Sequence, residues 1–284
     1  MKRTANAEPE RTSPSSPSSS SSPSSPSPRV SRRAAVSLVA ATAAELVVDL
    51  PRSARAFDDD GAFDPRFLLT GNARWEGVRT TAPGRWSKEL ADRTSAPARL
   101  GPGTVRADEP ALLAEPFALW GGDGTVPPLT DREVSGLQRF IALGGVLLID
   151  EFAPEKGAFL RSVKRELARV LPEGSPIPIG DENVIFRSFY LLRRAAGRVE
   201  GPAKLEAIIR GGVPQVIFSA HDLMGALARS PSGLNPIPVT PGGERQREKA
   251  VRLAVNIAMY VLCSSYKDDQ VHAPFLMRRR KATP

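Results

Sequence analysis

The stretch LGGVLLIDE, residues 143–151, does most to set the fold class of this 284-residue chain. Its glycine pair is typical of a helix end, because glycine readily adopts the left-handed backbone that closes a helix. Four apolar residues follow, 146–149, and they predict a short strand that is buried on both faces and therefore central in its sheet. Asp150 and Glu151 come directly after this strand.

A helix and further strands are predicted upstream of this stretch. Thr130 stands three residues before Glu133, which is the capping-box spacing of a helix start, and apolar residues then recur at helical spacing. Residues 117–120 read as a buried strand that opens into a tight loop at Gly121, Gly122 and Asp123. Earlier still, residues 67–69 predict a first strand and residues 86–91 a helix.

The same alternation continues downstream. Apolar spacing predicts a helix over 159–170 and a long final helix over 244–263. Residues 184–192, 205–209 and 215–219 read as strands, and the last of them ends at Ser219, just before His221 and Asp222. Alternating strands and helices predict an α/β domain of three layers with a mainly parallel central sheet, and one such domain spanning 57–275.

Three of the predicted strands end in polar groups. In open parallel sheets, ligands bind beyond the carboxyl ends of the strands. If these ends are neighbours, the candidates for general acid–base catalysis are Asp150, Glu151, His221 and Asp222. The carboxylates and the histidine at these ends could alternatively hold a hard cation. The candidates for ligand binding are Gly121, Gly122, Asp123 and Ser219. The structural alternative is that Asp222 caps the next helix and His221 satisfies a backbone carbonyl.

Cysteine and histidine are scarce. The single cysteine, Cys263, excludes an intramolecular disulfide and any multi-cysteine metal site, and its apolar helical surroundings predict a buried structural thiol. The only histidines are His221 and His272, so neither a metal nor another cofactor is predicted. Phosphate-binding and dinucleotide-binding glycine motifs and a serine-nucleophile elbow are absent from the sequence.

The first 56 residues predict a leader rather than part of the fold. Residues 13–28 contain only Ser and Pro, a composition typical of disorder. Arg32 and Arg33 precede an uncharged stretch, 34–44, which suits a signal peptide and is too short to span a bilayer. Ala54 and Ala56 supply the small-x-small pattern of a cleavage site. The paired arginines favour the twin-arginine (Tat) pathway, and hence a periplasmic or secreted protein without a membrane span once mature.

A disordered basic tail with a chance apolar patch is the alternative for that leader.

The net charge of +8 does not favour nucleic acid as a partner. Residues 1–56 hold eight Lys and Arg against four Asp and Glu, and residues 278–281 add four cations within a predicted basic tail, 276–284. A phosphate-binding face would spread its charge along the domain.

The order of segments resembles the bacterial domain of unknown function numbered 4159. The resemblance rests on a strand ending in a glycine pair, on LTDRE at 129–133, on LGGVLLID at 143–150, on the Ile-Phe pair at 185–186, on the Ser-x-His-Asp-Leu ending of 215–223 and on a helix from Ala254 to Tyr260. It covers most of residues 57–275.

That family is similar to the class I glutamine amidotransferases and the trehalose-utilisation-like proteins, which implies a flavodoxin-like fold. Where the amidotransferases carry a nucleophilic cysteine, this chain has Asp150 and Glu151. A carboxylate does not attack a glutamine amide as a thiolate does, so glutaminase activity is not expected.

Two functions therefore stay open. The first is a non-catalytic binding or assembly module of the cell envelope, whose partner is an envelope protein or a small polar ligand. The second is a hydrolase or isomerase that acts on a sugar-like small molecule through Asp150 or Glu151, assisted by His221 and Asp222.

Overall fold

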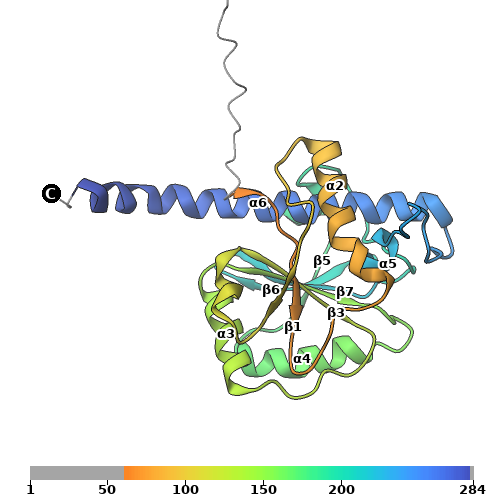
Figure 1. The fold of residues 1–284 in the computed structure, drawn as a ribbon, viewed down its shortest axis with the longest axis horizontal. Helices are drawn as coiled ribbons and strands as arrows, with labels where there is room; N and C mark the ends of the chain where they lie inside the picture. The colour runs from red at the N-terminus through yellow and green to blue at the C-terminus, as the bar shows by residue number, and fades with distance from the viewer. Residues whose placement is uncertain (1–60, 282–284) are drawn as a thin grey trace, which may run out of the picture. The chain divides into compact units, whose positions relative to one another are not determined.

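The computed structural model describes the backbone of residues 61–281 and the side chains of residues 61–264. These residues share one seven-stranded sheet of order β2-β1-β3-β4-β7-β6-β5 (Figure 1). The strands are β1 (Phe67–Leu69), β2 (Thr104–Arg106), β3 (Phe117–Gly122), β4 (Val146–Glu151), β5 (Ile177–Ile179), β6 (Leu205–Arg210) and β7 (Val213–Ser219). The neighbouring pairs β2–β1, β1–β3, β3–β4 and β4–β7 are parallel. Strand β6 pairs antiparallel with both of its neighbours, β7 and β5. The predicted α/β class with a mainly parallel sheet is confirmed.

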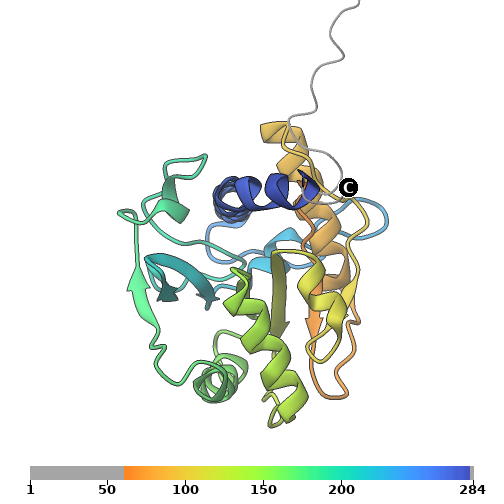
Figure 2. The same ribbon diagram turned by 90° about the vertical axis from the view of Figure 1, so that its left-hand side faces the viewer.

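Helices cover both faces of the sheet, which gives three layers (Figures 1 and 2). One face carries α3 (Asp131–Ala142) and α4 (Ala158–Val170), and the other carries α2 (Ala82–Thr94), α5 (Leu223–Leu227) and α6 (Gly243–Lys281). Short 3-10 helices occur at η2 (Val78–Thr81), η3 (Pro110–Ala114) and η4 (Val184–Arg187).

Strand β4 lies in the middle of the sheet, between β3 and β7, as the apolar run at 146–149 predicts. Successive side chains of a strand point to opposite faces. Accordingly Val146 and Leu148 pack in the cluster with α2 and α6, while Leu147 and Ile149 pack in the cluster with α3 and α4. Burial on both faces explains why this strand is wholly apolar until its last two residues.

The predicted capping box at the start of α3 is confirmed. The Glu133 backbone N–H donates to Thr130 Oγ1 at 3.3 Å, and the Thr130 N–H donates to Glu133 Oε2 at 2.8 Å. Glu133 is buried, and its other oxygen accepts from the Gly71 N–H at 2.6 Å. One carboxylate thus starts α3 and also holds the loop that follows β1.

Two expectations about secondary structure and burial are corrected, and two strands are added. Residues 184–192 form no strand: Asn183 caps η4, and the Asn256 side chain on α6 binds the backbone of Ile185 and Tyr190. Strands β2 and β5 were not predicted: each has three residues, of which only one is buried, so neither shows the apolar run that marks β1. Cys263 is exposed rather than buried, since it lies on α6 at the edge of the part that packs on the sheet.

Candidate functional site

The strand ends that carry the predicted site residues are neighbours in the sheet. Gly121 pairs with Asp150 across β3 and β4, and Asp150 pairs with Ser219 across β4 and β7. The condition on which the predicted site depended, that these strand ends are neighbours, is therefore met. Their side chains nevertheless divide into a buried group and an open group.

Asp150 belongs to the buried group. It is fully shielded from solvent, and its two oxygens accept hydrogen bonds from the backbone N–H groups of Leu223 at 3.0 Å and Met224 at 2.8 Å. Desolvation and the nearby charge of Asp222 raise the pKa of Asp150 to about 7, although both backbone donors favour the ionised form. Asp150 thus joins the end of β4 to the start of α5.

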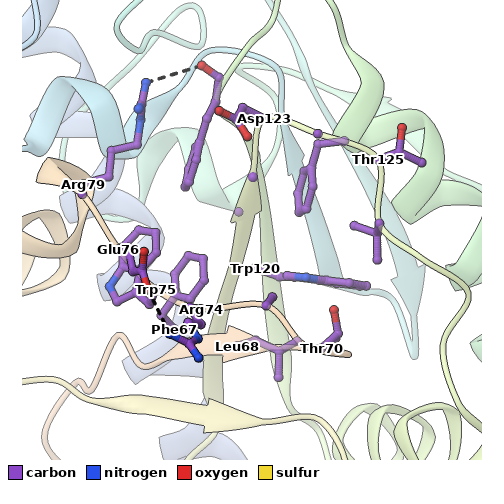
Figure 3. A pocket seen from close by; sticks show the side chains of 18 of the residues that line it. Phe67, Leu68, Thr70, Arg74, Trp75, Glu76, Arg79, Trp120, Asp123 and Thr125 are labelled. Carbon is purple, nitrogen blue, oxygen red and sulfur yellow. Dashed lines mark hydrogen bonds and ion pairs between the residues drawn. The ribbon is translucent and has the colours of Figure 1, made fainter.

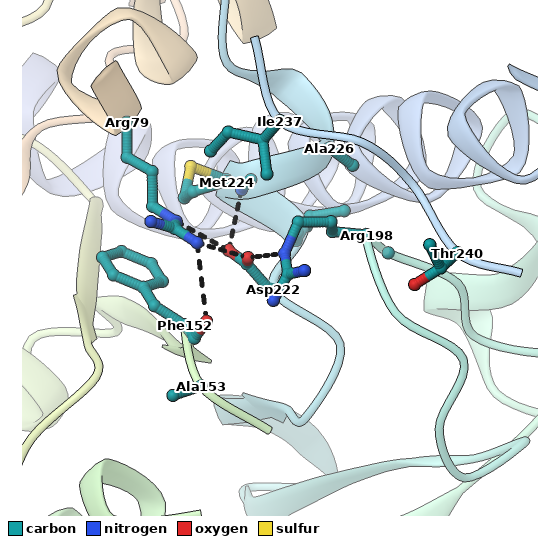
Figure 4. A network of polar contacts seen from close by, with 12 residues as sticks. Arg79, Phe152, Ala153, Arg198, Asp222, Met224, Ala226, Ile237 and Thr240 are labelled. Carbon is teal, nitrogen blue, oxygen red and sulfur yellow. Dashed lines mark hydrogen bonds and ion pairs between the residues drawn. The ribbon is translucent and has the colours of Figure 1, made fainter. Parts of the chain in front are cut away.

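Asp222 lies beside it and holds two arginines (Figure 4). The Arg79 Nε donates to Asp222 Oδ1 at 2.9 Å and Arg79 Nη2 to Oδ2 at 2.6 Å, while Arg198 Nε also donates to Oδ2. Its Oδ1 accepts from the Gly225 N–H at 2.8 Å and so caps α5. Asp222 adopts a left-handed backbone, φ +51°, which a non-glycine residue keeps only where its surroundings fix it.

Glu151 points to the opposite face of the sheet from Asp150, as the alternation of a strand requires. It too is fully buried, and it accepts from the Ala153 N–H at 3.1 Å and from the Leu160 N–H at 3.0 Å, in the first turn of α4. The two carboxylates at the end of β4 therefore serve two different helices and do not face one centre.

His221 and Ser219 complete the buried group. The His221 ring contacts the Pro202 carbonyl through Nε2 at 2.8 Å, so Nε2 carries the proton. Burial lowers the pKa of His221 and keeps the ring neutral. A Cβ added at Gly197 would lie 2.3 Å from the His221 carbonyl oxygen, which shows how closely the 195–202 loop packs here. Ser219 is buried opposite Asp150.

The open group is Gly121, Gly122 and Asp123, which line a cleft of about 480 Å³ (Figure 3). The cleft lies beyond the carboxyl ends of β1 and β3. From β1 the chain crosses through α2 to β2 on one side, and from β3 it crosses through α3 to β4 on the other. Such a reversal leaves a crevice between the two loops, and it is the usual ligand position in open α/β sheets.

The glycine pair makes room for aromatic rings rather than for a tight loop. Both glycines are the last residues of β3, and an added Cβ would lie 2.3 Å from the Phe152 ring at Gly121 and 2.6 Å from the Phe159 ring at Gly122. These rings line the cleft together with Phe67, Trp75 and Trp120. Trp75 stacks on Phe67 with ring centroids 3.5 Å apart.

Arg79 connects the cleft with the buried group. It lines the cleft, stacks 4.9 Å above the Phe152 ring and reaches the buried Asp222. Sequence reasoning missed Arg79 and Trp75, which lie in the polar loop after β1. The signal available was an isolated tryptophan followed by Glu76 and Gly77, in a loop that directly follows a strand.

A protein-family model matches the part of the chain that forms this sheet. Residues 66–262, well over half of the chain, match the model of the family described as "Domain of unknown function (DUF4159)". The chain belongs to the DUF4159 family. The matched residues include the whole sheet, the lining of the cleft and the buried carboxylates. No curated protein matches the sequence.

Two further observations concern only residues 61–281. None of the helices in that range combines the length and the apolar character needed to cross a membrane. Among the described side chains, those of residues 61–264, no three His, Cys, Asp or Glu residues come together in a group that could hold a metal ion.

Proposed function

We propose that this DUF4159 chain is an exported, non-catalytic binding or assembly module of the cell envelope. Its scaffold is flavodoxin-like and similar to the class I glutamine amidotransferases, without their nucleophile. The order β2-β1-β3-β4-β7 of the parallel strands supports this scaffold, because it corresponds to the 2-1-3-4-5 order of flavodoxin-like sheets. The predicted leader, with Arg32 and Arg33 before an apolar stretch and Ala54 and Ala56 after it, supports export; it lies outside the described residues.

One observation supports a non-catalytic function. The carboxylates at the strand ends are engaged inside the protein, where Asp150 and Glu151 accept backbone N–H groups and Asp222 pairs with two arginines. The adjoining cleft, in contrast, is open and lined by aromatic rings with a few polar groups, which is the usual lining of a ligand site.

The alternative, a hydrolase or isomerase acting on a sugar-like molecule, has less support. Its acid and base must lie within hydrogen-bond reach of one reacting centre. Asp150 and Glu151 point to opposite faces of the sheet, and His221 is turned to the Pro202 carbonyl. Of the four catalytic candidates, none lines the cleft.

Thermal unfolding of the full chain with a panel of small polar metabolites tests this proposal. A ligand that binds only the folded protein raises its Tm, by an amount equivalent to about 2.7 kcal/mol at a hundredfold excess over Kd. We expect such stabilisation in the wild type and its loss in Asp123→Arg, which places a cation at an exposed position of the cleft.

Asp92→Arg, on the exposed face of α2, is the matched control and should behave like the wild type. Turnover of any of these compounds that disappears in Asp150→Asn or Glu151→Gln, while the variants stay folded, would establish the enzymatic alternative instead.

A further inference from the structure

The lining of the cleft combines an apolar floor with a polar rim. Five aromatic residues from three separate segments of the chain line this floor, namely Phe67, Trp75, Trp120, Phe152 and Phe159. Trp75 is half-buried, while the other four rings are buried by their neighbours. Trp75 is therefore the most accessible of these rings, and it favours a ligand with an apolar face.

The rim supplies acceptors and donors that face the same space. Asp123 is exposed at the end of β3, and Arg79 lies on the same side of the cleft in Figure 3, above Trp75 and Trp120. A carboxylate only accepts hydrogen bonds and a guanidinium only donates them. Hydroxyl groups do both, so neighbouring hydroxyls of one ligand match this pair. Thr70 and Thr125 add side-chain hydroxyls at the rim.

The charges of the lining do not favour an anionic ligand. The Nε and Nη2 groups of Arg79 are engaged by the buried Asp222, and Arg74 lies 3.9 Å from Glu76. Asp123 adds an exposed negative charge that would repel a phosphate or carboxylate. An uncharged ligand avoids this repulsion.

We propose that the cleft binds a neutral carbohydrate, whose apolar C–H face packs on Trp75 while its hydroxyls bond to Asp123 and to the Nη1 group of Arg79, since Asp222 engages Nε and Nη2. This inference rests on the proposed binding function and names the ligand class. Asp123 and Arg79 set specificity by touching the ligand. Asp222 is a positioning residue, because it accepts hydrogen bonds from Nε and Nη2 of Arg79 and so fixes the guanidinium, but does not itself line the cleft.

The chain carries its own spectroscopic reporters for this site. Its three tryptophans are Trp75 and Trp120, which line the cleft, and Trp86, which is buried in the core with its indole N–H donated to the Ala254 carbonyl at 2.8 Å. Proton–nitrogen NMR spectra of the uniformly labelled full chain resolve three indole signals. The probes are neutral mono- and disaccharides, a hexuronate and inorganic phosphate, each titrated separately.

We expect at least one neutral saccharide to shift the Trp75 signal in a saturable manner and to leave Trp86 unchanged. Asp123→Asn keeps the shape of the side chain but removes its charge, and should weaken this binding about tenfold, as the loss of a charged hydrogen bond does. Asp92→Asn makes the same chemical change outside the cleft and should leave the affinity unchanged.

The other outcomes separate this inference from the proposed function. Saturable shifts with hexuronate or phosphate but with no neutral saccharide would overturn the carbohydrate assignment and keep a binding function at the cleft. A shift of Trp86 as large as that of Trp75 would overturn the location. A Trp75 signal unchanged by every probe would overturn the carbohydrate inference, and a metabolite panel that also fails to raise Tm would overturn the proposed function as well.

Discussion

Asp222 holds two guanidinium groups at a position where its own carboxylate has no contact with water. Asp222→Asn keeps the side-chain shape and an oxygen that can cap α5, and asparagine tolerates the left-handed backbone. It leaves Arg79 and Arg198 without their negative partner. We expect the free energy of unfolding to fall by about 3–5 kcal/mol, measured as a lower urea midpoint. A change below about 0.5 kcal/mol, as expected for the exposed Asp92→Asn, would contradict this role.

Asp150 makes stability depend on pH. Its pKa in the folded chain is raised to about 7 from an ordinary 3.8, so between these values the folded state binds the proton more tightly than the unfolded state does. Stability from this group is therefore greatest at low pH and declines as pH rises from about 4 to 7, by at most about 1.4 kcal/mol per pH unit.

Buried His221 contributes to the pH dependence of stability with the opposite sign, because its lowered pKa makes stability fall as pH drops below 6.5.

Comparing wild type with Asp150→Asn isolates the contribution of Asp150 to the pH dependence. We expect the stability of the wild type relative to this variant to decrease between pH 4.5 and pH 7.5 in urea titrations. A constant difference across that range would show that Asp150 keeps an ordinary pKa.

At the scale of elements, the end of β3 depends on its glycine pair. Gly121→Ala drives a methyl group into the Phe152 ring, and Gly122→Ala drives one into the Phe159 ring. We expect each to destabilise the fold by about 1–3 kcal/mol through overpacking. The control is Gly124→Ala in the next loop, where an added Cβ meets nothing within 4 Å. Thermal unfolding of the three variants measures this, and equal Tm values would refute the packing role.

Elements marked by an apolar run, an apolar stripe or a cap were predictable, and the short strands β2 and β5, which lack such a mark, were not. The apolar run of β4, the capping box of α3 and the stripe of α4 each carry a physical signature in a few residues. Residues 184–192 are apolar enough for a strand, but Asn256, which lies more than sixty positions away, determines their backbone path. A contact of that sequence separation leaves no local pattern.

The predicted site lay at the carboxyl ends of β3, β4 and β7. These strand ends are neighbours in the sheet, but the open cleft lies beyond β1 and β3, and of the predicted residues only those at the end of β3 line it. The direction of each carboxylate depends on the face of the sheet to which its strand position points and on where α5 begins. The spacing of residues in the sequence therefore does not distinguish the buried Asp150, Glu151 and Asp222 from the exposed Asp123. The contact of Arg79 with Asp222 joins residues 143 positions apart, and a contact of that sequence separation cannot be predicted from a local pattern.

At the scale of the whole molecule, export remains a prediction from residues outside the described range. The twin-arginine pathway requires both arginines of its signal. We expect Arg32→Lys with Arg33→Lys to retain the full chain in the cytoplasm of a bacterial host with that pathway, whereas the wild type reaches the periplasm. Cell fractionation measures this. Equal distribution of the two chains would contradict the signal assignment.

The indole spectrum of the three tryptophans, recorded with any compound that stabilises the protein, tests most directly whether the cleft beyond β1 and β3 is the binding site. We expect the signals of Trp75 or Trp120 to move on binding and that of Trp86 to stay in place, because only the first two line the cleft. A stabilising compound that leaves both cleft tryptophans unchanged would place its binding site elsewhere on the protein.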